Sequence, residues 1–229
     1  MSQPQITISF DQEKLGHLLE RREFGRFSDL RFRGRGDLNE VLHELASPTL
    51  SYTVERIRNI EKDTVRIGQG VPFTSPILAK VLAPCDEVVF FVVTIGGAVE
   101  EEVARLNDDG RLTEAYILDR LGSLTAEYTV NTFYNHMKRH CGKKGFGLTL
   151  RFSPGYCDWP ITEQKKLFHL VDTDSIGVTM TASCLMHPRK TVSGIFGLYR
   201  RNAEGKPRLY NPCAHCDNRT CNARRHGDA

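Results

Sequence analysis

The sequence of 229 residues lacks the features that mark membrane, secreted and fibrous proteins. Its longest strongly apolar stretch, Val88 to Val93, is far shorter than the roughly 18 residues that a membrane span needs. The polar start, MSQPQITISFDQ, has no apolar signal-peptide region. With 19 Gly and 10 Pro the chain is also poor in the residues of fibrous or low-complexity proteins. We therefore expect a globular cytoplasmic protein that has no membrane partner.

A large excess of charge of one sign is also missing. The 31 Lys and Arg residues are nearly balanced by 28 Asp and Glu residues, which leaves a formal net charge of +3. Such a mild charge does not require nucleic acid as a partner. The sequence has no P-loop, no nucleophile elbow, no His-Glu-x-x-His and no glycine-rich dinucleotide fingerprint after a strand. These absences weigh against a hydrolytic enzyme and against a dinucleotide-binding fold.

Hydrophobic patterns that are present predict several strands. Ile6, Ile8 and Phe10 alternate with polar residues, which is typical of a half-buried strand. The run between Glu87 and Ile95 is β-branched and aromatic, and it predicts a strand that is buried on both faces. Further strands are expected in the segment FGLTLRF (146–152) and in the runs 176–181 and 191–198.

Helices are predicted between these strands. Ser47 followed by Pro48 is a helix-start signal, and Ser75 with Pro76 repeats it, so we expect two short helices there. The spacing that supports the first of them is that of Leu50, Val54, Ile57 and Ile60. Helices are also expected at 98–107, at about 113–139 as the spine of the domain, and from Thr162 onward.

The order of these elements shows no regular β-α-β alternation, so the sequence predicts one α+β domain with a mostly antiparallel twisted sheet flanked by helices. We divide the chain into an N-terminal helical and strand part (1–84), a core (85–205) and a cysteine-rich C-terminal tail (206–229). The basic, glycine-rich segment 21–35 is interpreted as a loop or an exposed hairpin. A solvated surface is favoured there over an anion site.

The segment RFSPGYCDWP (151–160) is the most informative for function. An arginine such as Arg151 can hold a carboxylate through two parallel hydrogen bonds, and Gly155 lets a ligand approach the backbone. The face of Tyr156 or of the nearby tryptophan attracts cations. A small zwitterion with a positive centre would suit this segment. An ordinary tight turn is the alternative.

Three segments together resemble the activation domain of cobalamin-dependent methionine synthase: DRLGSLTAEY in the long helix, RFSPGYCDWP, and SCLMHPRKTVSGIFG. The resemblance covers about residues 85 to 200. In that family the domain binds S-adenosylmethionine and closes over the corrinoid, so that oxidised cob(II)alamin is reduced by one electron and remethylated. Because this chain has no cobalamin-binding Asp-x-His-x-x-Gly segment, the resemblance implies a free-standing domain that acts on a separate corrinoid protein.

The family's motifs imply the site residues one by one. Its Arg-x-x-x-Gly-Tyr signature, whose arginine meets the methionyl carboxylate, matches Arg151, Gly155 and Tyr156, and Ser153 offers backbone near the ligand. The family's Ser-x-x-Met-x-Pro and Ser-Val-Ser-Gly motifs are expected to build the floor of the site, with Ser193 as a cofactor-binding residue. They match Ser183, Met186, Pro188, Val192, Ser193 and Gly194, with Thr191 in place of one serine.

The chain departs from the family at two acidic positions. The helix carboxylate that contacts the ligand falls at Ser123, which leaves Glu127, one turn later, as the acidic candidate or as a solvated helix residue. The glutamate before the first conserved serine falls at Ala182. The implied reaction, attack of cob(I)alamin on the methyl group of a sulfonium, asks the protein for orientation and exclusion of water. No catalytic side chain is assigned for that reason.

Seven cysteines include a tight C-terminal group, Cys213, Cys216 and Cys221, which we call the tail cysteines. An odd count with one cluster does not indicate a disulfide framework. The spacing C-x2-C-x4-C in a reducing compartment suits an iron–sulfur cluster or structural zinc, and free thiols in a flexible tail are the third possibility. Candidates for a fourth ligand are His215, His226, Cys184 and Cys157.

Three functions remain open after this reading. The first is an S-adenosylmethionine-binding module, a methyltransferase component that supports reductive remethylation of cob(II)alamin on a separate methionine synthase lacking this domain. It would use a low-potential electron donor of the flavodoxin or ferredoxin type. The second is a thiol-ligated metal protein, iron–sulfur or zinc, for electron transfer or docking to a corrinoid methyltransferase, without methyl transfer of its own. The third is a catalytically silent assembly factor.

Overall fold

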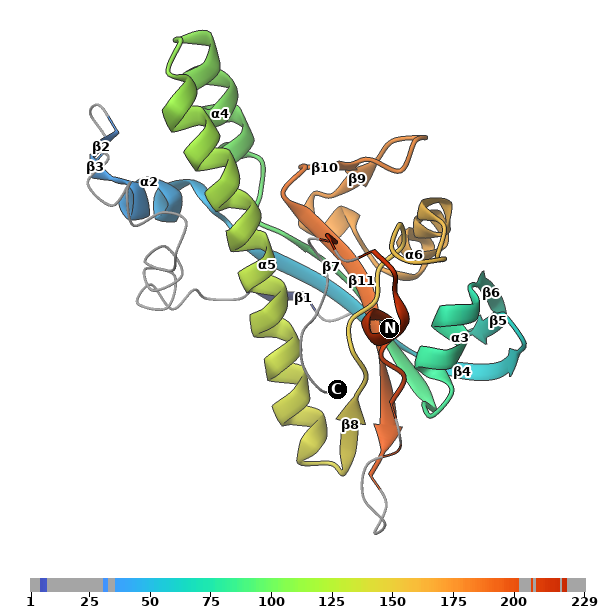
Figure 1. Ribbon diagram of the computed structural model, residues 1–229. Coiled ribbons are helices and arrows are strands. Elements are labelled where there is room, and N and C mark those ends of the chain that lie inside the picture. Colours follow the sequence, from blue (N-terminus) through green and yellow to red (C-terminus); the bar gives the residue numbers. More distant parts are fainter. Residues whose placement is uncertain are drawn as a thin grey trace.

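The computed structural model describes residues 5–7, 31–32, 36–201, 207, 209–218 and 220–221. At its centre is a seven-stranded sheet in the order β6-β5-β4-β7-β11-β8, with β1 paired to β4 (Figure 1). The strands of this sheet are β1 (Gln5–Thr7), β4 (Thr49–Glu61), β5 (Thr64–Ile67), β6 (Val71–Thr74), β7 (Glu87–Thr94), β8 (Phe146–Leu148) and β11 (Thr191–Arg200). Two short hairpins pair β2 (Arg31–Phe32) with β3 (Gly36–Asp37) and β9 (Thr179–Met180) with β10 (Met186–His187).

Helices lie on both faces of the sheet. They are α2 (Leu38–Leu45), α3 (Pro76–Leu82), α4 (Ala98–Asp108), α5 (Leu112–Gly142) and α6 (Gln164–Leu170), with 3-10 turns η1 (Ile161–Glu163), η2 (Asp174–Ile176) and η3 (Pro212–His215). Every strand pair in the described part of the chain is antiparallel. The predicted α+β class with a mostly antiparallel sheet is therefore confirmed.

The central strand β7 is buried on both faces, as its apolar run predicts. Successive side chains of a strand point to opposite faces, so β7 supplies two separate apolar clusters. The odd-numbered residues pack against α5, and the even-numbered ones pack with α3, α6 and Trp159. The first set is Val89, Phe91 and Val93, and the second is Val88, Phe90 and Val92.

The long helix α5 crosses one face of the sheet (Figure 1). It extends the predicted helix 113–139 by a few residues at its C-terminal end. Its middle packs on the sheet through Val130, Phe133 and Met137, whereas its first turns pack against α4. Among the described residues no helix combines the length and apolar composition needed to cross a membrane. The helix is thus the spine that the sequence predicts, and its inner face sets one wall of the site below.

The helix predicted from Ser47 is wrong, because residues 49–61 form strand β4. Leu50 and Val54 are four residues apart, and this spacing also places two side chains on the same face of a strand. The backbone N–H of Ser47 donates to the carbonyl of Ile95 at 2.8 Å and does not begin a helix. The strand is held by pairing with β7, which the local sequence does not reveal.

A β-bulge completes the false helical pattern in β4. Ile57 pairs with Ile67 of β5, and Ile60 pairs with Val65, with a register shift between Ile57 and Asn59. Because residues 65 and 67 point to the same face of β5, Ile57 and Ile60 also share a face although they are three residues apart. The bulge thereby imitates helical periodicity.

Other predicted elements have mixed outcomes. The helix predicted at Ser75 is confirmed, since the Ser75 hydroxyl accepts from the backbone N–H of Leu78 at 2.9 Å and Pro76 begins α3. The strand predicted from Ile6 is described only for β1, and its remainder lies outside the described residues. The strand predicted at 176–181 shrinks to β9, preceded by η2. Most of segment 21–35 also lies outside the described residues, although β2 belongs to a short hairpin.

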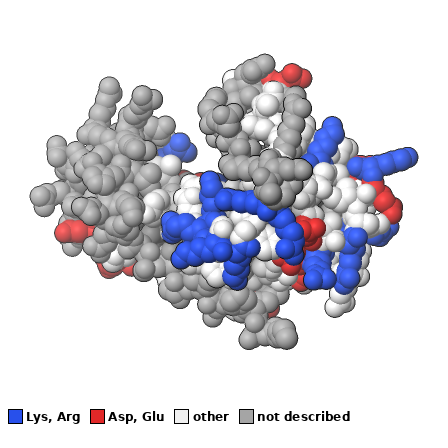
Figure 2. Space-filling model, turned by 90° about the horizontal axis from the view of Figure 1, so that it is seen from below, with Lys and Arg blue, Asp and Glu red and all other residues white. Residues whose placement is uncertain are grey.

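Basic side chains gather where the C-terminal end of α5 meets β8 and β11 (Figure 2). The backbone N–H of Arg201 donates to the carbonyl of Gly145 at 2.9 Å, and the Arg200 guanidinium lies 5.1 Å from the centre of the Phe146 ring. The exposed members of this patch are Lys138, Arg139, Lys143, Lys144, Arg200 and Arg201. The nearly balanced composition therefore conceals a local excess of positive charge.

Candidate functional site

The segment 151–160, which we call the ligand loop, begins beside the central sheet. Phe152 forms an isolated antiparallel bridge with Ile195 of β11, with N–H to O distances of 2.9 and 2.8 Å. The Ser153 hydroxyl donates to the backbone carbonyl of Ser193 at 2.7 Å. These contacts fix the first three residues of the ligand loop to β11.

The middle of the ligand loop is a closed turn. The N–H of Gly155 donates to the carbonyl of Trp159 at 2.8 Å, and the N–H of Trp159 donates to the carbonyl of Tyr156 at 3.1 Å. Gly155 has φ +89°, a conformation that favours glycine, and Cys157 has φ +55°. Tyr156 and Cys157 are exposed at the tip of this turn.

The far end of the ligand loop is anchored in the core. Asp158 accepts from the backbone N–H of Ile77 at 3.0 Å and from the hydroxyl of Ser75, so it supports the start of α3. Trp159 is fully buried and stacks on Phe152, with ring centroids 5.4 Å apart. Within the described residues the Trp159 indole N–H has no hydrogen-bond acceptor. The turn is therefore held from both sides while its tip faces outward.

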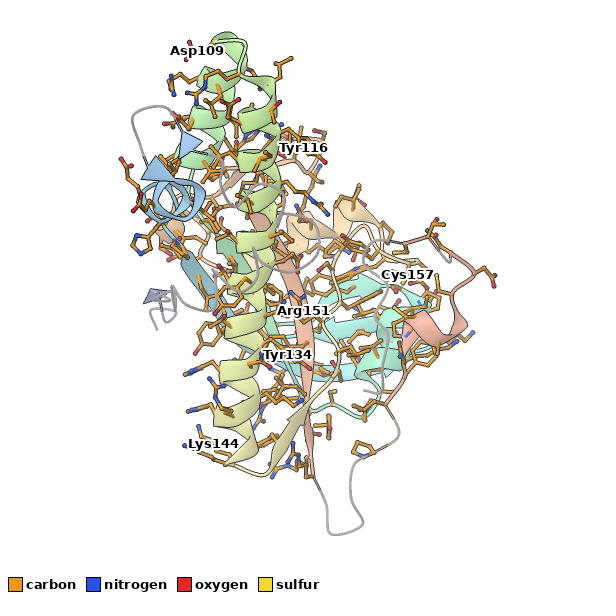
Figure 3. The ribbon with its side chains drawn as sticks, turned by 60° about the vertical axis from the view of Figure 1, so that its left-hand side comes forward. Asp109, Tyr116, Tyr134, Lys144, Arg151 and Cys157 are labelled. Atoms are coloured by element: carbon orange, nitrogen blue, oxygen red, sulfur yellow. The ribbon has the colours of Figure 1, made fainter. Side chains whose placement is uncertain are left out.

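Arg151 lies at the start of the ligand loop beside α5 (Figure 3). Its side chain is only 13% exposed, and its Nη2 lies 3.1 Å from Oε2 of Glu127, which is 54% exposed. This is its one ion pair among the described residues, and most of its five N–H donors have no partner there. A largely buried guanidinium of this kind is suited to a carboxylate.

Ser123, the position at which the sequence analysis expected the family's helix carboxylate, takes part in a different contact. Its Oγ accepts from Nζ of Lys190 at 2.9 Å, and the same Nζ lies 2.7 Å from Oδ1 of Asp119. Asp119, Ser123 and Glu127 are spaced by four residues and so share one face of α5. Ser123 thus belongs to a contact centred on Lys190, and Glu127 is the acid that meets Arg151.

Ser193 is buried under the ligand loop. Its hydroxyl donates to Oε1 of Gln164 at 3.0 Å, and Nε2 of Gln164 donates to the carbonyl of Cys184 at 3.1 Å. Ser193 therefore supports Ser153 from below, while its own hydroxyl is directed to Gln164. Sequence reasoning did not identify Gln164, because a single buried glutamine at the start of a short helix has no distinguishing pattern.

Gly194 follows Ser193 at a point of close approach. A Cβ at this position would lie 2.7 Å from Oγ of Ser153 and 3.0 Å from the carbonyl oxygen of Phe152. The first distance is too short for a side chain and the second is tight, so the glycine permits the ligand loop to lie directly on β11. The packing of the ligand loop on β11 therefore accounts for the glycine of the predicted Ser-Gly motif.

The described part of the C-terminal tail, residues 209–218, lies beside the Trp159 end of the ligand loop. Leu209 packs against the apolar cluster that contains Trp159, and Nζ of Lys80 lies 5.5 Å from the ring centre of Tyr210. Asn211 caps η3 by accepting from the N–H of Cys213 at 3.0 Å. Figure 3 shows Cys157 next to this turn.

The cysteines fall into two groups. Cys85, Cys141 and Cys184 are buried, and burial raises the pKa of Cys85 to about 12. Cys157 and the tail cysteines are more accessible, and all seven are free thiols. The pKa of Cys157 is raised first by burial and then by the negative charge of Cys216, Cys213, Asp158 and Cys221. His215 (side chain) and His226 lie outside what the structure describes.

Comparison with known proteins gives one family. Residues 77–204 match the family described as "Vitamin B12 dependent methionine synthase, activation domain". The chain belongs to this family. Among curated proteins there is no match.

The fold is similar to a solved structure described as "MetH Reactivation Domain bound to AdoHcy". The two share 15% sequence identity with a TM-score of 0.62, and the alignment covers 91% of this chain and 81% of that chain. At this identity the likeness establishes the fold of the activation domain. The ligand AdoHcy belongs to that structure.

The geometry groups the predicted site residues into two contacts. Arg151 meets Glu127, and Ser153 meets Ser193, while Gly155 and Tyr156 form the adjacent turn. The predicted motif residue Ser183 lies apart from these contacts, where its hydroxyl lies 2.9 Å from that of Thr181. Ligand roles for these residues stay predictions.

Proposed function

We propose that this activation domain binds S-adenosylmethionine at the ligand loop and supports reductive remethylation of cob(II)alamin on a separate corrinoid protein. The observation that carries the proposal is the largely buried Arg151, which lies at the start of a hydrogen-bonded turn and has one carboxylate partner among the described residues. Family membership supports the link to a cobalamin-dependent methionine synthase. The partner would be a methionine synthase that lacks this domain.

The residues present fit the amino-acid end of the nucleotide. Arg151 would hold its carboxylate, and Glu127, already within 3.1 Å of Arg151, would face its ammonium group. Gly155 offers an exposed backbone without a side chain, and the exposed ring of Tyr156 suits a sulfonium. Ser153 and Ser193 would act through the position of the loop.

The chain's contribution to the reaction is orientation. The nucleotide would supply a methyl group, and the corrinoid of the partner protein would supply the cobalt centre that attacks it. The anchored loop holds the amino-acid end in one place, which lowers the entropic cost of alignment. The chain would thus be one component of a methyltransferase in the cytoplasm, with a low-potential flavodoxin- or ferredoxin-type donor supplying the electron.

Calorimetric titration with S-adenosylmethionine tests the binding site. Arg151→Ala removes a charge-assisted contact and should weaken binding by about 1.5–3 kcal/mol, roughly 10- to 150-fold. Arg139→Ala, an exposed arginine near the end of α5, is the matched control and should bind as the wild type does. Equal affinities of Arg151→Ala and wild type would place the nucleotide elsewhere.

Remethylation itself is tested with a reduced corrinoid protein. Formation of methylcobalamin from S-adenosylmethionine should require this chain and should fall in the Arg151→Ala variant at nucleotide concentrations below saturation. Methylcobalamin formation that is unchanged without the chain would contradict the proposal.

A second candidate function rests on the tail cysteines. Cys213, Cys216 and Cys221 are close in sequence, and the charge of each affects Cys157. They would hold zinc or an iron–sulfur cluster for electron transfer or docking. This function needs no nucleotide. Metal analysis and a visible spectrum of anaerobically purified protein distinguish it, because a colourless sample with zinc removes electron transfer.

A further inference from the structure

We propose that Cys157 joins the three tail cysteines in one four-thiolate metal centre, which fastens the C-terminal tail to the ligand loop. Among the candidates for a fourth ligand, the structure favours this thiol by its position. The metal part of the proposal is independent of the nucleotide. A coupling between metal and nucleotide, described below, rests on the proposed function.

The position of Cys157 carries the first step. It lies at the exposed tip of the ligand loop, next to η3, which begins one residue before Cys213 (Figure 3). The chain returns to this place because Leu209 packs on the cluster around Trp159 and Tyr210 lies under Lys80. Two residues that the core already holds thus bring the tail cysteines to the loop.

The charges near Cys157 also support its grouping with the tail cysteines. Burial is the first cause of the raised pKa of Cys157, and the negative charges of all three tail cysteines add to it, so the four thiols share one electrostatic neighbourhood. Four thiolates this near repel each other, and a bound cation removes the repulsion. Cys157 also keeps φ +55°, which non-glycine residues rarely adopt and which recurs at ligand-holding sites.

The other candidate thiols are less suited. Cys85 and Cys141 are buried, and burial raises the pKa of each. Cys184 is buried beside Gln164, which binds its carbonyl. Cys157 is the one cysteine outside the tail that is exposed.

The chemistry is that of a thiophilic metal. The spacing C-x2-C-x4-C with one remote cysteine gives four sulfur ligands, a set that suits zinc or an iron centre. Around a divalent ion four thiols lose four protons, which leaves a centre with a net charge of −2. In their present arrangement no three His, Cys, Asp or Glu side chains of the described residues are placed to hold a metal. Binding therefore includes a closing movement of the tail toward Cys157.

Coupling to the ligand loop follows from sequence adjacency. Cys157 directly follows Gly155 and Tyr156, so a metal that fixes its sulfur also fixes the turn that would meet the nucleotide. Metal should then strengthen nucleotide binding. By thermodynamic reciprocity the nucleotide must strengthen metal binding by the same factor.

The metal site is tested on the full chain with Co²⁺ as a spectroscopic probe and Zn²⁺ in competition with a chromophoric chelator. Wild type should bind one equivalent with thiolate-to-cobalt charge-transfer bands and intense tetrahedral d–d bands. Cys157→Ser should weaken Zn²⁺ binding at least tenfold and change the d–d bands, while Cys141→Ser should match wild type. Unchanged affinity in Cys157→Ser, or no binding by wild type, overturns the proposal.

Two further measurements cover other outcomes. If Cys157→Ser does not fold, alkylation of the wild-type chain followed by mass spectrometry gives the answer, because metal should protect Cys157 together with the tail cysteines. Protection of the tail cysteines alone refutes the role of Cys157.

Iron and sulfide analysis of anaerobically purified protein separates the two metals. A brown wild-type sample whose colour is lost in Cys157→Ser identifies iron. A colourless wild-type sample whose zinc is lost in Cys157→Ser identifies zinc.

The coupling is tested by titrating S-adenosylmethionine into the zinc-loaded and the metal-free chain. We expect at least fivefold tighter binding with zinc, and an equal gain in zinc affinity when the nucleotide is present. Equal nucleotide affinities with and without metal contradict the coupling. Failure of both forms to bind the nucleotide contradicts the proposed function and leaves the metal result standing.

Discussion

Two cationic side chains meet the same face of α5, and their surroundings differ. Lys190 is 9% exposed and bonds both Asp119 and Ser123, so its ammonium group is enclosed by protein partners. Among the described residues Arg151 meets only Glu127, whose side chain is 54% exposed. The contact of Lys190 holds α5 to the start of β11, whereas the contact of Arg151 leaves most of its guanidinium donors without a partner in the described part of the chain.

Removal of the Lys190 partner should have the largest effect on stability. Among the described residues, Asp119→Ala leaves the buried ammonium of Lys190 with only the hydroxyl of Ser123 as a partner. We expect a loss of about 2–3 kcal/mol, below the full cost of breaking a buried pair because Asp119 is 44% exposed. Urea denaturation measures this loss. The double change Asp119→Ala with Lys190→Met should recover most of it, and a double variant as unstable as the single one would show that the ion pair is not the cause.

Gly194→Ala should have the second-largest effect on stability. It changes the packing under the ligand loop, which begins at Arg151. The new Cβ meets the hydroxyl of Ser153 and the carbonyl oxygen of Phe152, so the start of the ligand loop has to shift on β11, at a cost of about 1–3 kcal/mol. Nucleotide binding should weaken as well. Gly142→Ala, in the last turn of α5 with open space around it, is the control and should be neutral or stabilising by thermal unfolding. A neutral Gly194→Ala would contradict the close packing.

Glu127→Gln should have the smallest effect on stability. Its exposed ion pair with Arg151 contributes less than about 1 kcal/mol, so urea denaturation should hardly change, in contrast to Asp119→Ala. Calorimetry should nevertheless show weaker S-adenosylmethionine binding, because the ammonium group of the nucleotide loses its proposed carboxylate partner, Glu127. Tighter binding would mean that Glu127 competes with the ligand for Arg151.

The sequence predicted the elements whose pattern is local. The apolar run of β7, the length of α5 and the Ser75 cap of α3 each depend on neighbours along the chain. Strand β4 was mistaken for a helix because its pairing partners lie elsewhere and its bulge imitates helical spacing. The short strands β5 and β6 and helix α2 were not predicted.

The candidate site divides in the same way. The Arg-x-x-x-Gly-Tyr motif is contiguous, so the ligand loop could be found from the sequence. The contact of Arg151 with Glu127 joins residues 24 positions apart, and that of Lys190 with Asp119 joins residues 71 positions apart. Such contacts depend on how α5 lies across the sheet. Gln164 and the approach of the tail to Cys157 depend on the same tertiary arrangement.

The two-sided burial of β7 has a consequence for how sequences of this kind can diverge. Six successive apolar side chains of the strand, Val88 to Val93, are enclosed, so a polar residue at any of these positions would leave an unpaired group in the interior. Changes that adapt the domain to a new partner must therefore accumulate at the rim, in loops and at chain ends. These six positions are free only to exchange one apolar side chain for another of similar volume.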